Sequence, residues 1–320
     1  MIRIIRCFDL LILEGFQLKI LLTGGTGFIG TQLMKHLHKE RYHTYVLTRT
    51  PYQYHNHSLA TYLSYDDAHE QLNKVDVIIN LAGESLFGYW TKDKQEKIIR
   101  SRIETTEWVI TFIKQLDEAP KLLINGSAIG YYGTSDDDMF TENTTDAGND
   151  FLAKVVKEWE QTAQQAETFG VRTVFTRFGI VLGKEGALPL MALPVKFGLG
   201  GNIGNGQQWL SWIHVEDAAR LMMHIINDES IRGPINVTAP NPVRHKDFMR
   251  TLADVLKRPY WLHTPAFLFR AATGKMSFLI LEGQYVLPKK AMEHQFKFIY
   301  PHLEDALNHL LKRKQSFTSD

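Results

Sequence analysis

The 320-residue sequence has a single cysteine, Cys7, which excludes an intramolecular disulfide framework and a thiolate-rich metal site. A lone cysteine suits a reducing compartment, and we expect a cytoplasmic protein. The sequence also lacks an excess of charge of either sign, since 36 basic and 35 acidic residues leave a formal net charge of +1. It contains no marked basic run. This balance argues against nucleic acid or an anionic membrane as the main partner.

Metal-binding and membrane-spanning patterns are equally scarce. The 13 histidines are scattered without a His-Glu-x-x-His pattern, so we expect no metal. No apolar run is long enough to cross a bilayer. The short run Leu10–Leu13 is bracketed by Asp9 and Glu14, which does not fit a secretory signal. We interpret residues 1–17 as an appendage to the fold or the product of an upstream start codon.

Hydrophobic patterning predicts alternating strands and helices over the first half of the chain. Short apolar runs indicate buried parallel strands, and longer stretches with apolar residues three or four positions apart indicate helices. The expected strands are Lys19–Thr23, Thr44–Thr48, Val75–Leu81, Lys121–Asn125, Val171–Arg177 and Pro234–Thr238. The expected helices are Thr31–Lys39, Thr91–Leu116 with Thr91 as its cap, and Phe151–Phe169 ending at Gly170. This order predicts an α/β fold with a doubly wound parallel sheet.

The sequence changes character at Gly179. Residues 183–206 are rich in glycine, and most of the prolines follow Ala239. We therefore expect a Rossmann-type domain and a smaller, mostly helical substrate lobe. The predicted division is 18–178 with 213–238 for the Rossmann-type domain, 179–212 with 239–311 for the lobe, and 312–320 for a frayed tail.

A glycine-rich turn joins the first expected strand to the first expected helix. It reads TGGTGFIG, with glycines spaced G-x-x-G-x-x-G. Gly24 permits the tight turn, Gly27 lets the backbone approach a pyrophosphate, and Gly30 lets the helix pack on the strand. Free amides at the helix N-terminus then face the anion. We predict a dinucleotide site, with a ligand-free turn as the less favoured alternative. The cofactor-binding residues would be Thr23, Gly24, Gly25, Thr26, Gly27, Phe28, Ile29 and Gly30.

Arg49 follows the second expected strand. NAD-binding proteins of this type carry an acidic residue near that point for the ribose 2′-hydroxyl, whereas an arginine suits a 2′-phosphate. NADP(H) is therefore favoured over NAD(H). The alternative interpretation of Arg49 is a solvated surface side chain.

Four motifs are spread along the chain: TGGTGFIG, NLAG (Asn80–Gly83), SAIGYYG (Ser127–Gly133) and WIHVEDAA (Trp212–Ala219). They resemble the extended short-chain dehydrogenase/reductases of the NAD(P)-dependent epimerase/dehydratase family. SRIETT at Ser101–Thr106 and GLGGNIGNGQQWLSWIH at Gly198–His214 are similar to its subgroup of epimerase family proteins. The resemblance implies an active site between the sheet and the lobe. It also implies cofactor contacts from Asn80, Leu81, Ala82 and Gly83.

The chemistry of that family uses a tyrosine, a lysine four residues later and a nearby Ser or Thr hydroxyl. Ser127 fits the hydroxyl and Lys154 fits the lysine, which places Asp150 at the tyrosine position, where it offers no phenol. Tyr132 or Tyr131 could supply the phenol instead. At least one of these two tyrosines is expected to be an aromatic wall beside the cofactor.

Two further departures concern the substrate. Enzymes of the family that act on nucleotide sugars carry an asparagine three residues after the arginine that Arg177 resembles, and an arginine where this chain has Leu210. Both are missing, so the resemblance implies an unknown small molecule other than a standard nucleotide sugar. Arg102 could bind an anionic substrate, with Glu84 as its partner and Tyr131 as a further contact. The alternative for Arg102 is a salt bridge on the helix surface.

Two functions remain open from the sequence. The first is an NADP(H)-dependent oxidoreductase or epimerase-like enzyme, in which Ser127 and a tyrosine of the Tyr131–Tyr132 pair handle the proton. The second is a cofactor-binding redox sensor with little or no catalysis, which the missing phenol at Asp150 favours. Either protein could assemble as a homodimer.

Overall fold

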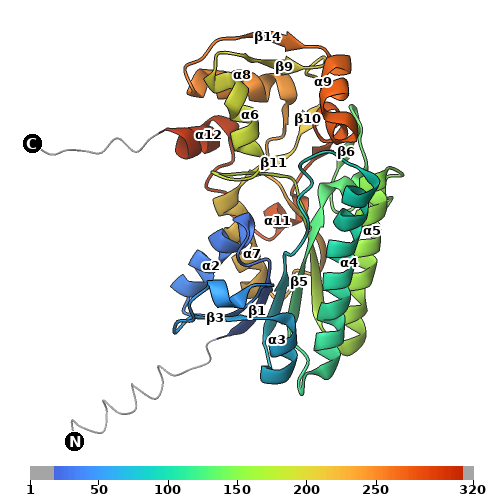
Figure 1. Cartoon of the computed structure of the whole chain (residues 1–320), viewed down its shortest axis with the longest axis vertical. Helices are drawn as coiled ribbons and strands as arrows, with labels where there is room; N and C mark the ends of the chain where they lie inside the picture. Colours follow the sequence, from blue (N-terminus) through green and yellow to red (C-terminus); the bar gives the residue numbers. More distant parts are fainter. Residues whose placement is uncertain (1–17, 313–320) are drawn as a thin grey trace, which may run out of the picture.

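A seven-stranded parallel sheet forms the centre of the computed structural model, which describes residues 18–312 (Figure 1). The strand order is β12-β7-β5-β4-β1-β2-β3. The order changes direction between β1 and β4, and such a switch point opens a crevice at the carboxyl ends of the two strands. The strands are β1 (Lys19–Thr23), β2 (His43–Leu47), β3 (Ala60–Leu63), β4 (Val77–Asn80), β5 (Leu122–Ala128), β7 (Arg172–Phe178) and β12 (Gly233–Val237).

Helices cover both faces of this sheet, as a parallel sheet requires. Helices α2 (Phe28–Lys39) and α7 (Val215–Asn227) lie on one face, while α3 (Tyr65–Gln71), α4 (Lys92–Gln115) and α5 (Phe151–Gln164) lie on the other. Figure 1 shows α4 and α5 side by side along the sheet.

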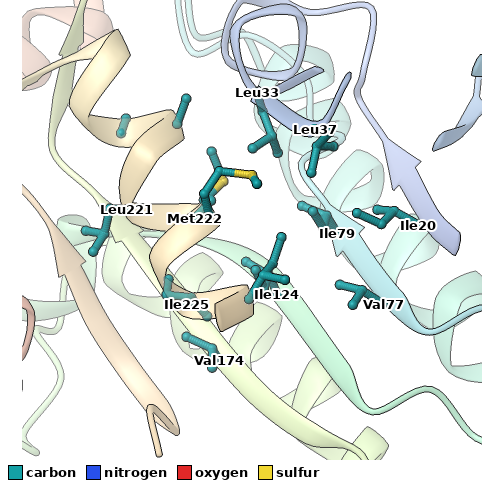
Figure 2. Close-up of a cluster of buried hydrophobic side chains, with 14 of the residues drawn as sticks. Ile20, Leu33, Leu37, Val77, Ile79, Ile124, Val174, Leu221, Met222 and Ile225 are labelled. Carbon is teal, nitrogen blue, oxygen red and sulfur yellow. The ribbon is translucent and has the colours of Figure 1, made fainter. Parts of the chain in front are cut away.

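Six of the seven strands contribute to two hydrophobic cores, and β12 contributes to one of them. In β1, Ile20 and Leu22 pack toward α2 and α7, whereas Leu21 packs toward α4. This alternation is the side-chain period of an extended chain. In Figure 2, Leu33 of α2 and Met222 of α7 lie among the aliphatic side chains of the strands. Burial of each such side chain contributes on the order of 2 kcal/mol, so the two cores hold the strand ends in fixed positions.

The alternating order of strands and helices confirms the expected fold. Thr91 caps α4 by accepting a hydrogen bond from the amide of Lys94, and Gly170 ends the helical stretch in the left-handed conformation, with φ of 78°. Strand β5 runs to Ala128, three residues farther than expected, and therefore carries Ser127 inside the sheet. The sequence prediction missed β3 and α3, because α3 buries only Ala68 and has no apolar stripe.

The lobe has its own core, built around Trp212 and Phe248. It joins helices to two small sheets, one of β10 with β13 and one of β9 with β14. The lobe elements are α6 (Ala187–Lys196), β9 (Gly200–Ile203), β10 (Trp209–Leu210), β13 (Val243–Arg244), α8 (His245–Val255), β14 (Tyr260–Thr264), α9 (Ala266–Thr273), α10 (Phe278–Leu281) and α12 (Leu303–Leu311).

Short elements connect the lobe to the sheet. The expected division placed helix α11 (Lys289–Glu293) in the lobe. Its residue Ala291 packs into the core beneath α7, so this helix belongs with the sheet. The expectations for residues 1–17 and 313–320 lie outside the described residues. The remaining elements are β6 (Met139–Phe140), β8 (Ile180–Leu182), β11 (Trp212–His214), β15 (Tyr285–Val286) and the 3-10 turns Pro51–Gln53, Ile129–Tyr132, Gln165–Phe169 and Gly274–Ser277.

Candidate functional site

The glycine-rich turn leaves the N-terminus of α2 without a side-chain cap. Gly27 is the N-cap residue, and its carbonyl accepts a 2.8 Å hydrogen bond from the amide of Thr31. Within the described part of the chain, no side chain accepts a hydrogen bond from the first-turn amides of this helix. Uncapped amides at the start of a helix, beside the crevice of the sheet, fit a pyrophosphate. The residues of this turn therefore suit the dinucleotide that the sequence predicts.

The three spaced glycines differ in what surrounds them. Gly24 has φ of +69°, and a Cβ there would lie 2.7 Å from the carbonyl carbon of Leu81. A Cβ on Gly30 would lie 2.2 Å from the carbonyl oxygen of Gly24. Gly27 is different, because its Cβ would meet only that same oxygen, at 3.3 Å. Gly24 and Gly30 are thus required by the fold, whereas Gly27 faces the space that a ligand would fill.

The side chain of Phe28 is in close contact with a later turn of the chain. A Cβ on Gly183 would lie 2.4 Å from the Phe28 ring, and one on Gly186 would lie 3.1 Å from it. The ring therefore rests on the 183–186 turn that follows β8. Phe28 can offer the dinucleotide its backbone amide, and its aromatic ring belongs to the packing.

Thr23 and Asn80 form a buried polar network rather than an open contact surface. The Thr23 hydroxyl donates to Asn80 Oδ1 at 2.6 Å and accepts from the amide of Ala82 at 3.1 Å. The Asn80 amide donates to Thr106 Oγ1 at 2.9 Å and to Asn125 Oδ1 at 2.7 Å. Both residues are fully buried, so their side chains position the backbone after β4 and do not reach a cofactor themselves.

A cavity of about 370 Å³ lies between the strand ends and the lobe. Most of its lining is apolar. Among the described residues that line it there is no tyrosine, histidine, lysine or cysteine, and the charged ones are Arg102, Asp150 and Glu282. Its walls include Leu81–Gly83 after β4, Gly126–Gly130 from β5 onward, Phe178–Val181 after β7, Trp209–Ser211, and Phe278 and Leu279 with Glu282–Gln284 from the lobe.

Helix α5 turns an apolar face toward this cavity. Leu152 and Val156 line it, four residues apart, whereas Lys154 is exposed. At about 100° per residue, Lys154 lies about 200° around the helix from Leu152. Asp150 is the N-cap of α5, accepting from the amides of Leu152 at 2.8 Å and Ala153 at 3.0 Å. The structure therefore does not bring Lys154 to the site, and the apolar periodicity of this helix was the signal for its orientation.

Neither candidate tyrosine lines the cavity. Tyr132 is 4% exposed, and its hydroxyl donates to Asn236 Oδ1 at 2.8 Å. Burial raises the pKa of this phenol. The Tyr131 hydroxyl donates to the carbonyl of Thr145 at 2.7 Å, and its ring lies 3.5 Å from the guanidinium carbon of Arg177. Both rings lie against the guanidinium of Arg177 instead of facing the cavity.

Ser127 does line the cavity, and its hydroxyl has a buried acidic partner. Ser127 Oγ lies 2.5 Å from Glu160 Oε1. Glu160 also accepts two hydrogen bonds from Arg177, at 2.8 and 2.7 Å. A carboxylate in such a pair is ionised and can only accept. Ser127 must therefore donate its single proton to Glu160, which leaves its lone pairs available to the cavity.

Sequence reasoning missed Glu160. The signal was an acidic residue on the buried face of an otherwise apolar helix, next to Trp159 and Val156. Such a residue is rarely buried unless it is paired.

Arg102 lines the cavity from α4, where burial lowers its pKa to about 10. Its Nη1 donates to the carbonyl oxygens of Ile98, at 2.9 Å, and Glu84, at 3.2 Å. The Glu84 carboxylate is bonded instead to Lys94, at 2.6 Å, and this hydrogen bond lowers the pKa of Glu84. The expected pairing of Glu84 with Arg102 thus exists only through the main chain of Glu84.

Arg49 is exposed just beyond the end of β2. In residues 18–312 it takes part in no salt bridge, and no acidic residue lies between His43 and Gln53. The same part of the chain holds no cluster of three or more His, Cys, Asp or Glu side chains suited to a metal ion. None of its helices combines the length and apolarity that a membrane crossing requires.

Comparisons with known proteins identify relatives along nearly the whole chain. A family model described as the NAD dependent epimerase/dehydratase family matches residues 20–238, and one described as a domain of unknown function, DUF1731, matches residues 264–310. Epimerase family protein YfhF from Bacillus subtilis (strain 168) is 47% identical over 302 residues, which make up 93% of this chain and 100% of that protein.

Two solved structures are similar as well. The human epimerase family protein SDR39U1 (isoform 2), solved with NADPH, superposes with a TM-score of 0.83 at 29% identity and covers 91% of this chain and 98% of its own. A nucleoside-diphosphate sugar epimerase from Corynebacterium glutamicum superposes with a TM-score of 0.74 at 28% identity. That match covers 93% of this chain and 59% of the other protein.

Proposed function

Because the chain belongs to the NAD dependent epimerase/dehydratase family, we propose that it is an NADP(H)-dependent oxidoreductase acting on a small molecule other than a standard nucleotide sugar. The observation that carries the proposal is the largely apolar cavity where the ends of β4, β5 and β7 meet the lobe. A bound nicotinamide cofactor would supply or accept a hydride there. Leu210, 2% exposed in the cavity wall, supports the choice of substrate, since it cannot grip a diphosphate as an arginine would.

Arg49 supports a preference for NADP(H). It is an exposed cation just past β2, with no acidic residue beside it in the sequence to receive a ribose hydroxyl. The presence of NADPH in the human relative is in keeping with this preference. The pyrophosphate would be held by the uncapped amides of α2.

Ser127 orients the substrate in this proposal. Its proton is committed to Glu160, so its oxygen accepts a hydrogen bond from the ligand. That arrangement suits a substrate in its alcohol form, whose hydroxyl donates to Ser127. On oxidation the hydroxyl proton would pass to Ser127 while the proton of Ser127 moves to Glu160, so that Glu160 is the final proton acceptor. Lys154 has no part in the reaction, because its side chain faces solvent.

The test measures the change in absorbance as the nicotinamide cofactor is reduced or oxidised. The protein is incubated with NADP⁺ and a panel of small alcohols, and separately with NADPH and the corresponding carbonyl compounds. We expect turnover that Ser127→Ala abolishes while NADPH affinity stays the same. Lys154→Ala is the matched control, and its turnover should equal that of the wild type. Equal activity of Ser127→Ala and the wild type would refute the role of Ser127.

A redox sensor that binds NADP(H) with little catalysis is the second candidate. The absence of any tyrosine, lysine or histidine from the described residues that line the cavity favours it. Tight NADPH binding, no turnover of any compound in the panel, and a changed protease-cleavage pattern on cofactor oxidation would support the sensor. Hydride transfer to a carbonyl compound that depends on Ser127 would exclude it.

A further inference from the structure

The guanidinium of Arg102 has more hydrogen-bonding capacity than the protein uses. Among the described residues the Arg102 side chain makes two hydrogen bonds, and Nη1 donates both of them, to the carbonyl oxygens of Glu84 and Ile98. Its other donors, Nε and Nη2, bond to no acceptor among the described residues. Arginine carries five N–H donors in a rigid fork, so one edge of the fork remains free.

Two neighbours hold this fork in place. The indole ring of Trp159 lies 5.3 Å from the Arg102 guanidinium carbon. On another side, a Cβ on Gly83 would lie 3.3 Å from the same carbon, so the missing side chain of Gly83 makes room for it. Trp159, Gly83 and Arg102 all line the cavity, which places the guanidinium at its wall.

The carboxylates of the cavity do not neutralise Arg102. Asp150 accepts from two amides of α5, Glu282 lies 3.7 Å from Arg270, and neither forms a salt bridge with Arg102 among the described residues. Glu84, the acidic residue whose charge acts on Arg102, has its carboxylate bonded to Lys94. Removing a cation from water without a partner costs free energy, and an anion bound at the cavity would recover that cost.

We propose that Arg102 binds an anionic group, a carboxylate or a phosphate, on an otherwise apolar substrate. This inference rests on the proposed function, because the same cavity takes both the nicotinamide and the substrate. The phosphates of the dinucleotide have other sites, at the amides of α2 and at Arg49, which leaves Arg102 for the substrate. The apolar remainder of the lining accepts the apolar body of that molecule.

The test measures binding by titration calorimetry to protein saturated with NADP⁺. The probes are benzoate, phenyl phosphate and the neutral isostere benzamide. We expect at least one of the two anions to bind about tenfold or more tightly than benzamide, a difference of about 1.4 kcal/mol. Comparison of benzoate with phenyl phosphate distinguishes a carboxylate site from a phosphate site. This comparison uses the wild-type protein and does not depend on any variant folding.

Variants then assign the effect to Arg102. Arg102→Gln should remove the preference for the anion, and Arg102→Lys should retain part of it because the charge remains. Arg100→Gln is the matched control, since Arg100 lies on the same helix but is exposed and paired with Glu104 at 2.7 Å. This control should bind the anions as the wild type does.

The proposal is overturned if neither anion binds better than benzamide, or if Arg102→Gln binds the anion with wild-type affinity. Loss of NADP⁺ affinity in Arg102→Gln would show that Arg102 serves the cofactor, which also overturns it. Failure of the proposed function looks different, because the wild-type protein would then bind no NADP⁺ or transfer no hydride, whatever the anion affinity.

Discussion

The hydroxyl of Ser127 donates to the carboxylate of Glu160 across 2.5 Å, at the inner wall of the cavity. Because Glu160 also pairs with Arg177, this contact links the cavity to a buried ion pair. Ser127 is thereby fixed in orientation and in its role as an acceptor toward any ligand. The effect of this contact on ligand binding can be measured by changing Ser127, and its effect on the stability of the fold by changing Glu160.

Glu160→Gln should destabilise the fold by about 3 kcal/mol, because Arg177 would remain buried without its counter-charge. The measurement is the free energy of unfolding in urea. Glu158→Gln, an exposed change on the same helix, is the control and should stay within about 0.5 kcal/mol of the wild type. A loss below about 1 kcal/mol in Glu160→Gln would contradict the buried pair.

Gly27→Ala and Gly30→Ala should separate binding from folding. A Cβ on Gly27 meets one backbone oxygen at 3.3 Å, so the fold should accept it while NADPH affinity falls about tenfold or more. A Cβ on Gly30 would lie 2.2 Å from a backbone oxygen and should lower the melting temperature by several degrees. Calorimetry with NADPH and thermal unfolding measure the two effects. Wild-type affinity in Gly27→Ala would count against the dinucleotide site.

Arg49→Glu should reverse the choice of cofactor. Removing the cation and adding an anion should weaken NADPH binding about tenfold or more while NADH binding changes little, since the two differ by the 2′-phosphate. Arg258→Glu makes the same change of charge at an exposed site in the lobe and should leave both affinities unaltered. If both cofactors weaken equally in Arg49→Glu, Arg49 does not recognise the 2′-phosphate.

His245 should make stability depend on pH. Burial lowers its pKa to about 4 in the folded protein, from 6.5 in the unfolded chain. Between these values the unfolded chain binds the proton and the folded protein does not, so acidification from pH 6.5 toward 4 destabilises the fold, by about 3 kcal/mol from this residue. His245→Gln should flatten the urea stability profile over that window. The exposed His55→Gln should leave the slope unchanged, and an equal effect of both variants would refute the assignment.

The sequence predicted six of the seven sheet strands, because each of these carries a short apolar run, and it missed β3. It predicted α2, α4 and α5 from the spacing of their apolar residues. The glycine-rich turn was equally readable, since its roles depend on local backbone geometry. The expectation for Lys154 was less successful. Its role was inferred from the spacing of a motif alone, whereas the orientation of α5 is set by packing of Leu152, Val156 and Trp159 against distant segments.

Polar side chains were hardest to interpret from sequence. Asn80 ends strand β4 at the edge of the sheet where the cofactor is expected. Its side-chain amide is nevertheless hydrogen-bonded to residues of β1, β5 and α4. Tyr132 lies close to Ser127 in the sequence, but its hydroxyl is bonded to Asn236, 104 positions away. Such pairings join strands, helices and turns that are distant in the sequence, and no local pattern contains them. The apolar face that α5 turns to the cavity and the unused hydrogen-bond donors of Arg102 could be seen only in the assembled fold.

The ring of Phe28 sits on the turn at Gly183 and Gly186, at the start of the segment that leaves the sheet for the lobe. This one aromatic ring thereby connects the start of α2, the first helix after the glycine-rich turn, with the turn after β8 that leads into the lobe. A side chain larger than hydrogen at Gly183 would displace this ring, and would therefore disturb the start of α2 and the turn toward the lobe together. Phe28 and the 183–186 turn can accordingly change only in concert.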